Sequence, residues 1–339
     1  MPVRGVTALS QSGPRLRIAV DGMGGDHAPE QVVEGAALAA AEHQIEVAVV
    51  GLPDRVQRLL DPHPSLRFVP ASQVIEMDDH PAQAVRAKAD SSMSVCARMC
   101  KQGDAAAWVS AGNSGGIMAA ALFLQGRIRG VDRPALGTIL PTAAEPAYFL
   151  DVGANVDSRP DFLVQFAQMG ALYAERVLGR AEPTVALLSN GEEEGKGDER
   201  VRETAARLRR TSVNFVGNVE PKDVLGGRAD VVVADGFVGN IAIKMAEATA
   251  ELIFRTMRDE IPRTLRGKAG GLLIRPGVGR IRARMDWREF GGAPLLGIDG
   301  VAVVAHGRSD ALAIKNAIRT AVQAVNADLV GKIREALGR

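Results

Sequence analysis

Glycine and asparagine stand side by side in several short loops that follow apolar runs of the sequence. Exposed backbone N–H groups in such loops can approach an anion closely, and a helix that begins there adds a favourable dipole. These loops indicate binding of phosphate or a similar anion, although each one alone would also suit an ordinary turn. The candidate binding residues are Asp21, Gly24, Gly25, Asp26, Gly112, Asn113, Ser114, Gly115, Asn155, Asn190, Gly191, Asn218, Asp235, Gly236 and Gly239.

The first glycine loop matches neither of the common nucleotide-binding motifs. Gly22 and Gly24 are followed by His27 where the dinucleotide pattern has its third glycine, and no Gly-Lys-Ser/Thr loop occurs in the sequence. The motifs therefore do not support a nicotinamide or ATP site. The carboxylates of Asp21, Asp26 and Asp235 could hold a metal ion or cap helices; we favour capping and predict no metal site.

One of these loops also fits the motif of serine acyl hydrolases. The segment 112–116 has the G-x-S-x-G pattern with Ser114 at its centre, between an apolar run and a helical segment. Asp235, Asp299 and His306 follow in the order of a catalytic triad. A serine thioesterase that uses Ser114 is therefore an alternative function.

Short apolar runs rich in Val, Ile and Ala alternate with segments of helical periodicity. The runs cover residues 16–20, 45–50, 105–109, 185–188, 213–216 and 231–234, and the helical segments cover 31–42, 116–125, 160–178, 197–209 and 309–330. Strand followed by helix, repeated, predicts a three-layer α/β/α fold with a mostly parallel central sheet. Because ligand sites in such folds lie beyond the carboxyl ends of the strands, we expect the glycine loops to converge on a single pocket.

The composition is that of a globular protein with no global preference for nucleic acid. The 339 residues are 46% hydrophobic and 24% charged, with a formal net charge of +1. Residues 1–15 have no continuous apolar core and are interpreted as a flexible extension, and residues 16–339 as one catalytic domain. No apolar run approaches the roughly 20 residues of a membrane span. Cys96 and Cys100 fit neither a disulfide framework nor a zinc site, so we expect reduced thiols in a cytoplasmic protein.

A strongly basic segment lies near the end of the chain. Residues 255–288 hold ten basic and three acidic side chains, a local charge of +7, and Ile274, Val278, Ile281 and Met285 fall on one helical stripe. Glycines at 267, 270, 271 and 277 predict two short helices, which together form an amphipathic hairpin over 250–288. The residues that could dock a partner are Arg266, Lys268, Arg275, Arg280, Arg282 and Arg284. An acidic carrier protein, anionic lipid, and packing against the protein's own core or a dimer mate all fit this pattern.

Taken together, these motifs resemble the phosphate acyltransferases of fatty acid and phospholipid synthesis, the PlsX family. The resemblance covers about residues 16–330. It rests on VDGMGGDHAP (20–29), SAGNSGG (110–116), LDVGANVD (150–157), LLSNGEEEGKG (187–197), FVGNVEPKDV (215–224), DGFVGN (235–240), EFGGAPLLGIDG (289–300) and HGRS (306–309). Gly22 replaces the family's usual Ala and Ser114 its usual Thr, so a hydroxyl at 114 resembles a hydrogen-bonding group rather than an essential nucleophile.

This resemblance implies that acyl-[acyl carrier protein] and inorganic phosphate are converted into acyl phosphate and free carrier. It further implies a fold similar to isopropylmalate dehydrogenases and phosphate acetyltransferases, a homodimer, and no organic cofactor. Peripheral contact with the inner membrane surface and with a downstream membrane glycerol-phosphate acyltransferase would fit the same pathway.

This reaction requires that phosphate and the thioester be positioned and that positive charge be nearby, more than it requires a strong base. Phosphate, with a second pKa of about 6 to 7, is largely dianionic at neutral pH. Lys196 and Lys244 are the cations nearest the loops, with Arg133 and Arg308 as second choices, and Asn240 adds an amide. His27 and His306 could protonate the leaving thiolate or make structural hydrogen bonds. A scaffold without catalytic activity, which binds its partner through the basic hairpin, is the third hypothesis.

Overall fold

The computed structural model describes residues 16–338 and builds them around an eleven-stranded sheet. The strand order is β3-β2-β1-β4-β11-β10-β5-β6-β9-β7-β8. The strands are β1 (Arg17–Asp21), β2 (Glu46–Gly51), β3 (Leu66–Pro70), β4 (Ala107–Ser110), β5 (Ala135–Leu140), β6 (Ala147–Leu150), β7 (Val185–Leu188), β8 (Phe215–Val219), β9 (Val231–Val233), β10 (Ala293–Leu296) and β11 (Val301–Val304). Most neighbouring pairs are parallel, which confirms the predicted fold class. The expected extension at 1–15 lies outside the described residues.

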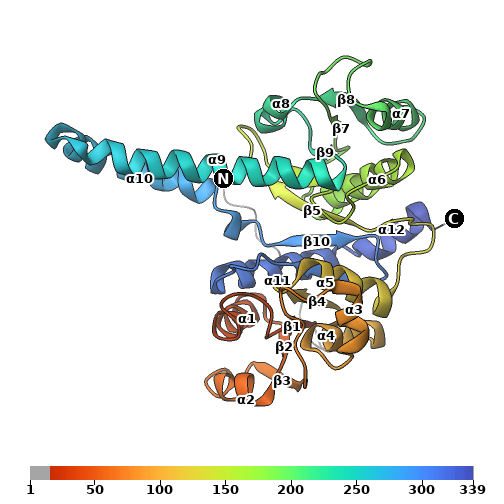
Figure 1. The fold of residues 1–339 in the computed structure, drawn as a ribbon, viewed down its shortest axis with the longest axis vertical. Coiled ribbons are helices and arrows are strands. Elements are labelled where there is room, and N and C mark those ends of the chain that lie inside the picture. The colour runs from red at the N-terminus through yellow and green to blue at the C-terminus, as the bar shows by residue number, and fades with distance from the viewer. Residues whose placement is uncertain (1–15, 339) are drawn as a thin grey trace.

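Helices cover the sheet and give the body two lobes (Figure 1). The lower lobe carries α1 (Glu30–His43), α2 (Pro53–Val56), α3 (Pro81–Ala87), α4 (Ser92–Gln102), α5 (Ser114–Ala120) and α11 (Ala311–Asn326). The upper lobe carries α6 (Pro160–Arg176), α7 (Glu199–Leu208) and α8 (Pro221–Gly226), and α12 (Leu329–Leu337) ends the chain beside α6. Short helical turns lie at Gln57–Leu60, Ala121–Gln125, Ile261–Arg263 and Trp287–Glu289. Strands β10 and β5 join the lobes in the middle of the sheet.

The core is built from the apolar faces that the sequence pattern predicts. In β2, Val47 to Val50 are fully buried, because both faces of this strand are covered by helices. Trp108 of β4 is buried as well, and its indole N–H donates a 2.8 Å hydrogen bond to Gln125 Oε1. Gly35 allows α1 to pack closely on α11, since a Cβ at this position would lie 2.6 Å from Ile314 Cβ. These contacts hold the lower lobe rigidly around β1 and β4.

Strand direction reverses in the middle of the sheet. β10 is antiparallel to both β11 and β5, and β5 is antiparallel to β6, whereas the pairs on either side are parallel. Three reversals leave β6, β9, β7 and β8 running opposite to β3, β2, β1, β4 and β11. The carboxyl ends of the two groups of strands therefore lie at opposite edges of the sheet.

The sequence pattern located six strands and several helices but missed β3, β5, β6, β10, β11 and the first part of α9 (Gly236–Glu260). All six predicted strands and the helices at 31–42, 160–178 and 197–209 agree with the structure to within a few residues. β5, β6 and β10 were not expected, because brief apolar runs between turn residues carry no clear period. The predicted helix at 309–330 is two helices: Asp328 adopts a left-handed conformation, with φ 47°, and separates α11 from α12.

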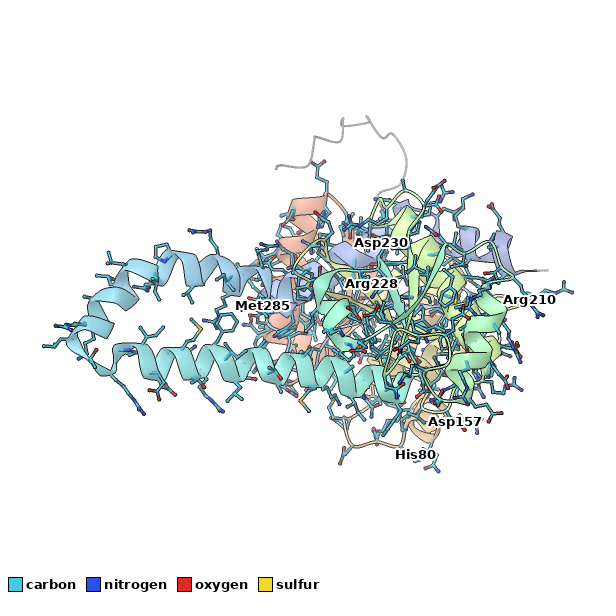
Figure 2. All side chains as sticks on the ribbon, turned by 90° about the horizontal axis from the view of Figure 1, so that it is seen from above. His80, Asp157, Arg210, Arg228, Asp230 and Met285 are labelled. Carbon is cyan, nitrogen blue, oxygen red and sulfur yellow. The ribbon has the colours of Figure 1, made fainter. Side chains whose placement is uncertain are left out.

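A long helical hairpin projects from the body (Figures 1 and 2). Its arms are α9 (Gly236–Glu260) and α10 (Leu265–Arg284). The predicted bounds of 250–288 and the break at the glycines are therefore wrong. α10 runs unbroken through all four glycines and Pro276, because the turn lies earlier, where Pro262 ends one arm and Thr264 Oγ1 caps the next by accepting from Gly267 N at 2.9 Å. None of the described helices combines the length and apolarity that a membrane crossing requires.

Candidate functional site

The loops after β1, β4 and β11 meet at one edge of the sheet; we call residues 21–27, 110–116 and 305–309 the first loop cluster. Asp21 ends β1 and is buried, and its Oδ2 accepts a 2.7 Å hydrogen bond from Ser110 Oγ at the end of β4. Ser110 Oγ in turn accepts from the amide of Gly112 at 3.1 Å. Burial raises the pKa of the Asp21 carboxyl above its ordinary 3.8, against the lowering effect of its hydrogen bonds. Asp21 thus positions the loops from beneath.

Glycines are required where these three loops touch. A Cβ on Gly24 would lie 2.6 Å from the amide nitrogen of Gly112. Gly25 has φ +107°, a conformation that other residues rarely adopt, and it lies against Ala111 and Gly307. The amide of Asp26 donates a 2.7 Å hydrogen bond to the carbonyl of Gly307. The three loops therefore form one continuous surface.

The first turn of α5 offers its backbone amides to this surface. Asn113 caps the helix: its Oδ1 accepts from the amide of Gly116 at 3.0 Å, and its Nδ2 donates to the carbonyls of Met77 at 3.0 Å and Asp79 at 3.2 Å. The side chain of Asn113 is thus fully used within the protein. The amides of Ser114 and Gly115 have no acceptor among residues 16–338 and are the donors left for an anion.

His306 lies at the rim of the first loop cluster beside an aromatic ring. Its Nδ1 accepts a 3.3 Å hydrogen bond from the amide of Arg308, and its ring centroid lies 5.3 Å from that of Trp287. Loss of solvent around the ring, and then the nearby Arg308, lower the pKa of His306 below 6.5; Lys244 adds a smaller effect in the same direction. Because Nδ1 accepts, the neutral ring carries its proton on Nε2. His27 is exposed in the loop after β1.

A catalytic triad around Ser114 is not assembled. The nitrogen of His306 that a triad carboxylate would orient is already bonded to the Arg308 amide. Asp299 pairs with Arg334 at 2.6 Å and with Lys101 at 3.6 Å, and Asp235 is bonded within the other lobe. Ser114 itself is exposed and has no side-chain hydrogen bond in the described part of the chain. The geometry therefore does not support the serine hydrolase alternative.

The two cysteines are free thiols on α4, as expected. Burial raises the pKa of both, so neither supplies a thiolate nucleophile.

The loops after β6, β7, β8 and β9 form a second loop cluster, which comprises residues 151–158, 188–198, 217–220 and 235–240. Its centre is Asp151, a residue that we did not single out from the sequence. The buried carboxylate accepts from the amides of Leu136, Gly153, Ala154 and Asn155, all between 2.8 and 3.1 Å, and from Asn155 Nδ2 at 2.9 Å. A buried acid with so many donors holds the loop and has no free lone pair directed at a ligand.

Most of the predicted binding residues in the second loop cluster make internal contacts. Asn155 Nδ2 also donates to Pro134 O, Asn190 Oδ1 accepts from the Gly197 amide at 2.9 Å, and Asn218 Nδ2 donates to Glu193 O at 3.2 Å. Side chains at 236 or 239 would collide with the loop at 151–155, so these glycines let α9 pack on it. Gly191 lies against the stem of Lys196. Asn240 lies beside Gly153.

Asp235 caps α9 and joins it to two other elements. Its Oδ1 accepts from the Phe237 amide at 3.0 Å, its Oδ2 from the Ser158 amide at 2.8 Å, and Arg200 of α7 lies 3.2 Å away. We did not predict Arg200 from the sequence, because it is one of several charged residues of the same helix and no motif distinguishes it. Lys196 is exposed; the neighbouring acids Glu192 and Glu194 pair with Arg228 and Arg209 instead.

The predicted residues therefore fall into two groups rather than the single pocket that we expected. The strands that end in the second loop cluster run opposite to β1, β4 and β11, so their loops lie at the other edge of the sheet. α9 connects the groups: it begins at Asp235 and carries Lys244 and Glu247 close enough to affect the pKa of His306. Of the two predicted lysines, Lys244 affects the pKa of His306 and Lys196 does not.

The basic residues of the hairpin are all exposed. Arg266, Lys268, Arg275, Arg280, Arg282 and Arg284 make no ion pair within residues 16–338. The predicted stripe on α10 is exposed too, with 47% of Ile274 and 54% of Ile281 accessible, so it does not pack on the protein's own core.

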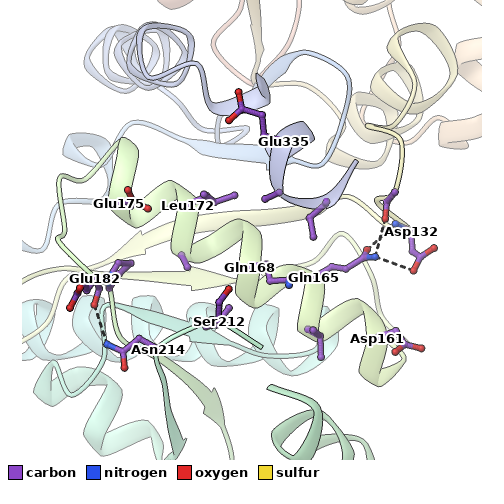
Figure 3. A pocket seen from close by; sticks show the side chains of 17 residues that line it. Asp132, Asp161, Gln165, Gln168, Leu172, Glu175, Glu182, Ser212, Asn214 and Glu335 are labelled. Carbon is purple, nitrogen blue, oxygen red and sulfur yellow. Dashed lines mark hydrogen bonds between the residues drawn. The ribbon is translucent and has the colours of Figure 1, made fainter. Parts of the chain in front are cut away.

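A large surface hollow lies elsewhere, between α6, α12 and the loops before β7 and β8 (Figure 3). Its volume is about 1030 Å³, and its charged lining consists of Asp132, Asp161, Glu175, Glu182 and Glu335. None of the predicted site residues lines it. Because its charged lining is entirely acidic, this hollow is unsuitable for phosphate.

Comparison with known proteins finds a matching family model and relatives that align over nearly the whole chain. Residues 16–332 match the family model described as fatty acid synthesis protein. A phosphate acyltransferase of Desulfitobacterium hafniense is 47% identical over 328 residues, which cover 96% of this chain and 98% of the relative. A phosphate acyltransferase of Nostoc punctiforme is 47% identical over 326 residues, 94% and 96% of the two chains.

Solved structures share the fold at low sequence identity. A phosphotransacetylase from Streptococcus pyogenes superimposes with a TM-score of 0.63 at 18% identity, over 92% of this chain and 94% of the other. A phosphotransacetylase from Staphylococcus aureus gives 0.61 at 18%, with the same coverage. A 4-hydroxythreonine-4-phosphate dehydrogenase from Klebsiella pneumoniae gives 0.54 at 15%, over 92% and 100% of the two chains.

Proposed function

Because this chain belongs to the fatty acid synthesis protein family, whose curated relatives are phosphate acyltransferases, we propose that it transfers an acyl group from acyl-[acyl carrier protein] to inorganic phosphate. The products are acyl phosphate and free carrier protein, and acyl phosphate supplies phospholipid synthesis. That the chain is an acyl-transferring enzyme follows from the family; the donor, the product and the residue roles are the proposal.

The reaction is a direct displacement at the thioester. An oxygen of the phosphate dianion attacks the carbonyl carbon, a C–O bond forms, and the carbonyl oxygen becomes an oxyanion. The oxyanion then re-forms the carbonyl as the C–S bond breaks, and solvent protonates the released thiolate. Because phosphate is already ionised, the protein contributes position and charge stabilisation.

The observation that carries this proposal is the junction of three glycine loops in the first loop cluster. It combines the free amides of Ser114 and Gly115 with His306 and, on α9, Lys244. In our proposal the amides and Lys244 hold phosphate, and Nε2–H of His306 donates to the oxyanion. The neutral ring suffices for this role, and its lowered pKa keeps it neutral at pH 7.

The hairpin supports a carrier protein as the donor. Six exposed basic side chains, which make no ion pair with residues 16–338, attract an acidic surface and speed its association. Anionic lipid would be attracted by the same charges, so we propose a cytoplasmic enzyme with peripheral contact at the inner membrane surface, where a downstream membrane glycerol-phosphate acyltransferase would receive the product. The exposed Phe237, Ile241 and Met245 on α9 suit the homodimer that we also propose.

The test is the phosphate dependence of thioester consumption. With acyl-carrier substrate and phosphate, free thiol and acyl phosphate should appear in equal amounts, the latter trapped as a hydroxamate by hydroxylamine. Without phosphate, thiol release should fall to the background rate. Equal thiol release with and without phosphate would contradict the proposed function.

A further inference from the structure

A groove lies where the hairpin leaves the body. It is enclosed by the middle of α9, the last turn of α10, the helical turn Trp287–Glu289 and the loop at 308–310. Figure 2 shows the two arms leaving the body side by side, with Met285 at the end of α10 nearest the body. The groove has a volume of about 490 Å³. This size lies within the roughly 300–1,000 Å³ that is usual for small-molecule sites.

Its lining combines apolar side chains with charged side chains of both signs. Ala250, Phe254, Met285 and Trp287 supply the apolar surface. Arginines at 255, 258 and 282 also line the groove, make no ion pair among the described residues, and can lay their aliphatic stems along its wall. Four acids, Glu247, Glu251, Asp286 and Asp310, line the groove as well, so it is the apolar side chains that suit an acyl chain.

The groove adjoins the first loop cluster, because Arg308 of this cluster and the neighbouring Trp287 both line it. The ring of Trp287 lies 5.3 Å from the ring of His306, and the guanidinium of Arg308 lies 5.2 Å from the centre of the indole. Gly307 lies between His306 and Arg308 in the sequence, and its carbonyl accepts a hydrogen bond from the amide of Asp26. A carbonyl held at His306 would therefore have its apolar substituent beside Trp287 and, further along, Phe254.

We propose that this groove binds the fatty acyl chain of the thioester donor. The inference rests on the proposed function and extends it: Trp287 forms the wall next to the reacting carbonyl, and Phe254 and Ala250 hold the part of the chain beyond the first few carbons. The groove is then the place where a long acyl chain is distinguished from a short one.

Binding is read without turnover through tryptophan fluorescence. The chain has two tryptophans; Trp108 is fully buried in the sheet, and Trp287 lines the groove. A pantetheine thioester that carries a brominated long acyl chain, added without phosphate, should quench the emission in a saturable manner. Quenching should persist in Trp108→Phe and disappear in Trp287→Phe. Absence of saturable quenching, or the same quenching in Trp287→Phe, would overturn the proposal.

Chain-length preference gives a second and independent readout. Ala250→Phe fills the groove and should lower kcat/KM for a sixteen-carbon pantetheine thioester at least tenfold, while a four-carbon thioester changes less than twofold. Ala248→Phe is the matched control, because Ala248 lies two residues away on α9, is exposed and does not line the groove. Both thioesters should react normally with this variant.

The outcomes separate this inference from the function on which it rests. Equal loss for both chain lengths in Ala250→Phe, or no loss for either, would reject the groove as the acyl site. If the wild type consumes thioester independently of phosphate, the proposed function fails, yet the quenching experiment still decides whether the groove binds the chain. Phe254→Ala, which widens the groove, should raise KM for the sixteen-carbon donor only.

Discussion

The hydroxyl of Ser110 donates a 2.7 Å hydrogen bond to the buried carboxylate of Asp21 and so ties the ends of β4 and β1 together beneath the first loop cluster. The same oxygen of Ser110 accepts from the Gly112 amide. One hydroxyl thus orients two of the three loops proposed to hold phosphate and the acyl carbonyl.

Removal of this hydroxyl should destabilise the protein. Ser110→Ala leaves one oxygen of Asp21 and the Gly112 amide without their partner in a buried position, at a cost of about 1–3 kcal/mol in the free energy of unfolding. Urea denaturation measures it. Ser114→Ala is the control: its hydroxyl is exposed, and we expect a change within about 0.5 kcal/mol. Equal effects of the two substitutions would contradict this role of Ser110.

The same control variant tests the hydrolase alternative. Without a triad around Ser114, Ser114→Ala should keep more than about a tenth of wild-type kcat, and the wild type should not be labelled by a fluorophosphonate. Loss of nearly all turnover together with labelling would restore Ser114 as a nucleophile.

Asp21 should make stability depend on pH in a defined direction. Its folded pKa is raised above 3.8 by burial, so the folded state still holds the proton when the unfolded chain has released it. The free energy of unfolding of the wild type minus that of Asp21→Asn should therefore decrease as pH rises from 3.8 through the folded pKa. Urea titrations at several pH values measure the difference, and an increase over this interval would show that hydrogen bonding outweighs desolvation.

Asp151 should be one of the most sensitive positions for folding. Asp151→Ala leaves four backbone amides without an acceptor and removes one of the two acceptors of Asn155 Nδ2, and we expect a loss of about 3 kcal/mol or more. Asp157→Ala, on an exposed position of the same loop, should cost less than about 0.5 kcal/mol. Thermal and urea unfolding compare them; a mild effect of Asp151→Ala would mean that the loop has other sufficient supports.

His306 should act as a neutral hydrogen-bond donor. Loss of one such donor to an oxyanion typically lowers kcat about 10²–10³-fold, so we expect this for His306→Ala and a smaller loss for His306→Gln, which keeps an N–H group. Protonation of the ring leaves the Nε2–H donor in place, so kcat of the wild type should fall at acid pH no more steeply than kcat of His306→Gln, since phosphate protonation causes the fall in both. A steeper fall in the wild type would show that the ring acts as a base and would exclude this role.

The basic side chains of the hairpin should affect binding of the carrier protein and leave the acyl-transfer reaction itself unchanged. The substitution of Arg275, Arg280 and Arg284 by Gln should raise KM for acyl-carrier substrate about tenfold or more, and remove most of its salt dependence, while kcat/KM for a pantetheine thioester stays within twofold. Arg282 is left unchanged because it lines the groove. The control replaces Arg55, Arg58 and Arg210, which are exposed on the body. Equal losses with both substrates would argue against docking.

The sequence by itself determined what is local. Glycine at 24 and 25 and aspartate as the cap at 235 follow from backbone geometry within a few residues, and each is found in the structure, whereas the cap at Asn113 was not predicted. The α/β class, the family and the basic segment before Arg288 were likewise evident, because apolar period, motif spacing and charge are properties of short stretches. Neither the buried hydrogen bonds of Asp151 nor the helix through Pro276 could be read in this way.

Tertiary structure alone decided which of these features share a site. The three antiparallel pairs around β10 and β5 reverse the sheet and send the loop of Asn155 to one edge and that of Asn113 to the other. Pairing between strands that lie far apart in the chain is fixed by packing and by hydrogen bonds across the sheet. The apolar periodicity of one strand therefore does not indicate whether its neighbour runs parallel or antiparallel to it. For the same reason, only the folded chain brings Trp287 of the hairpin base against His306.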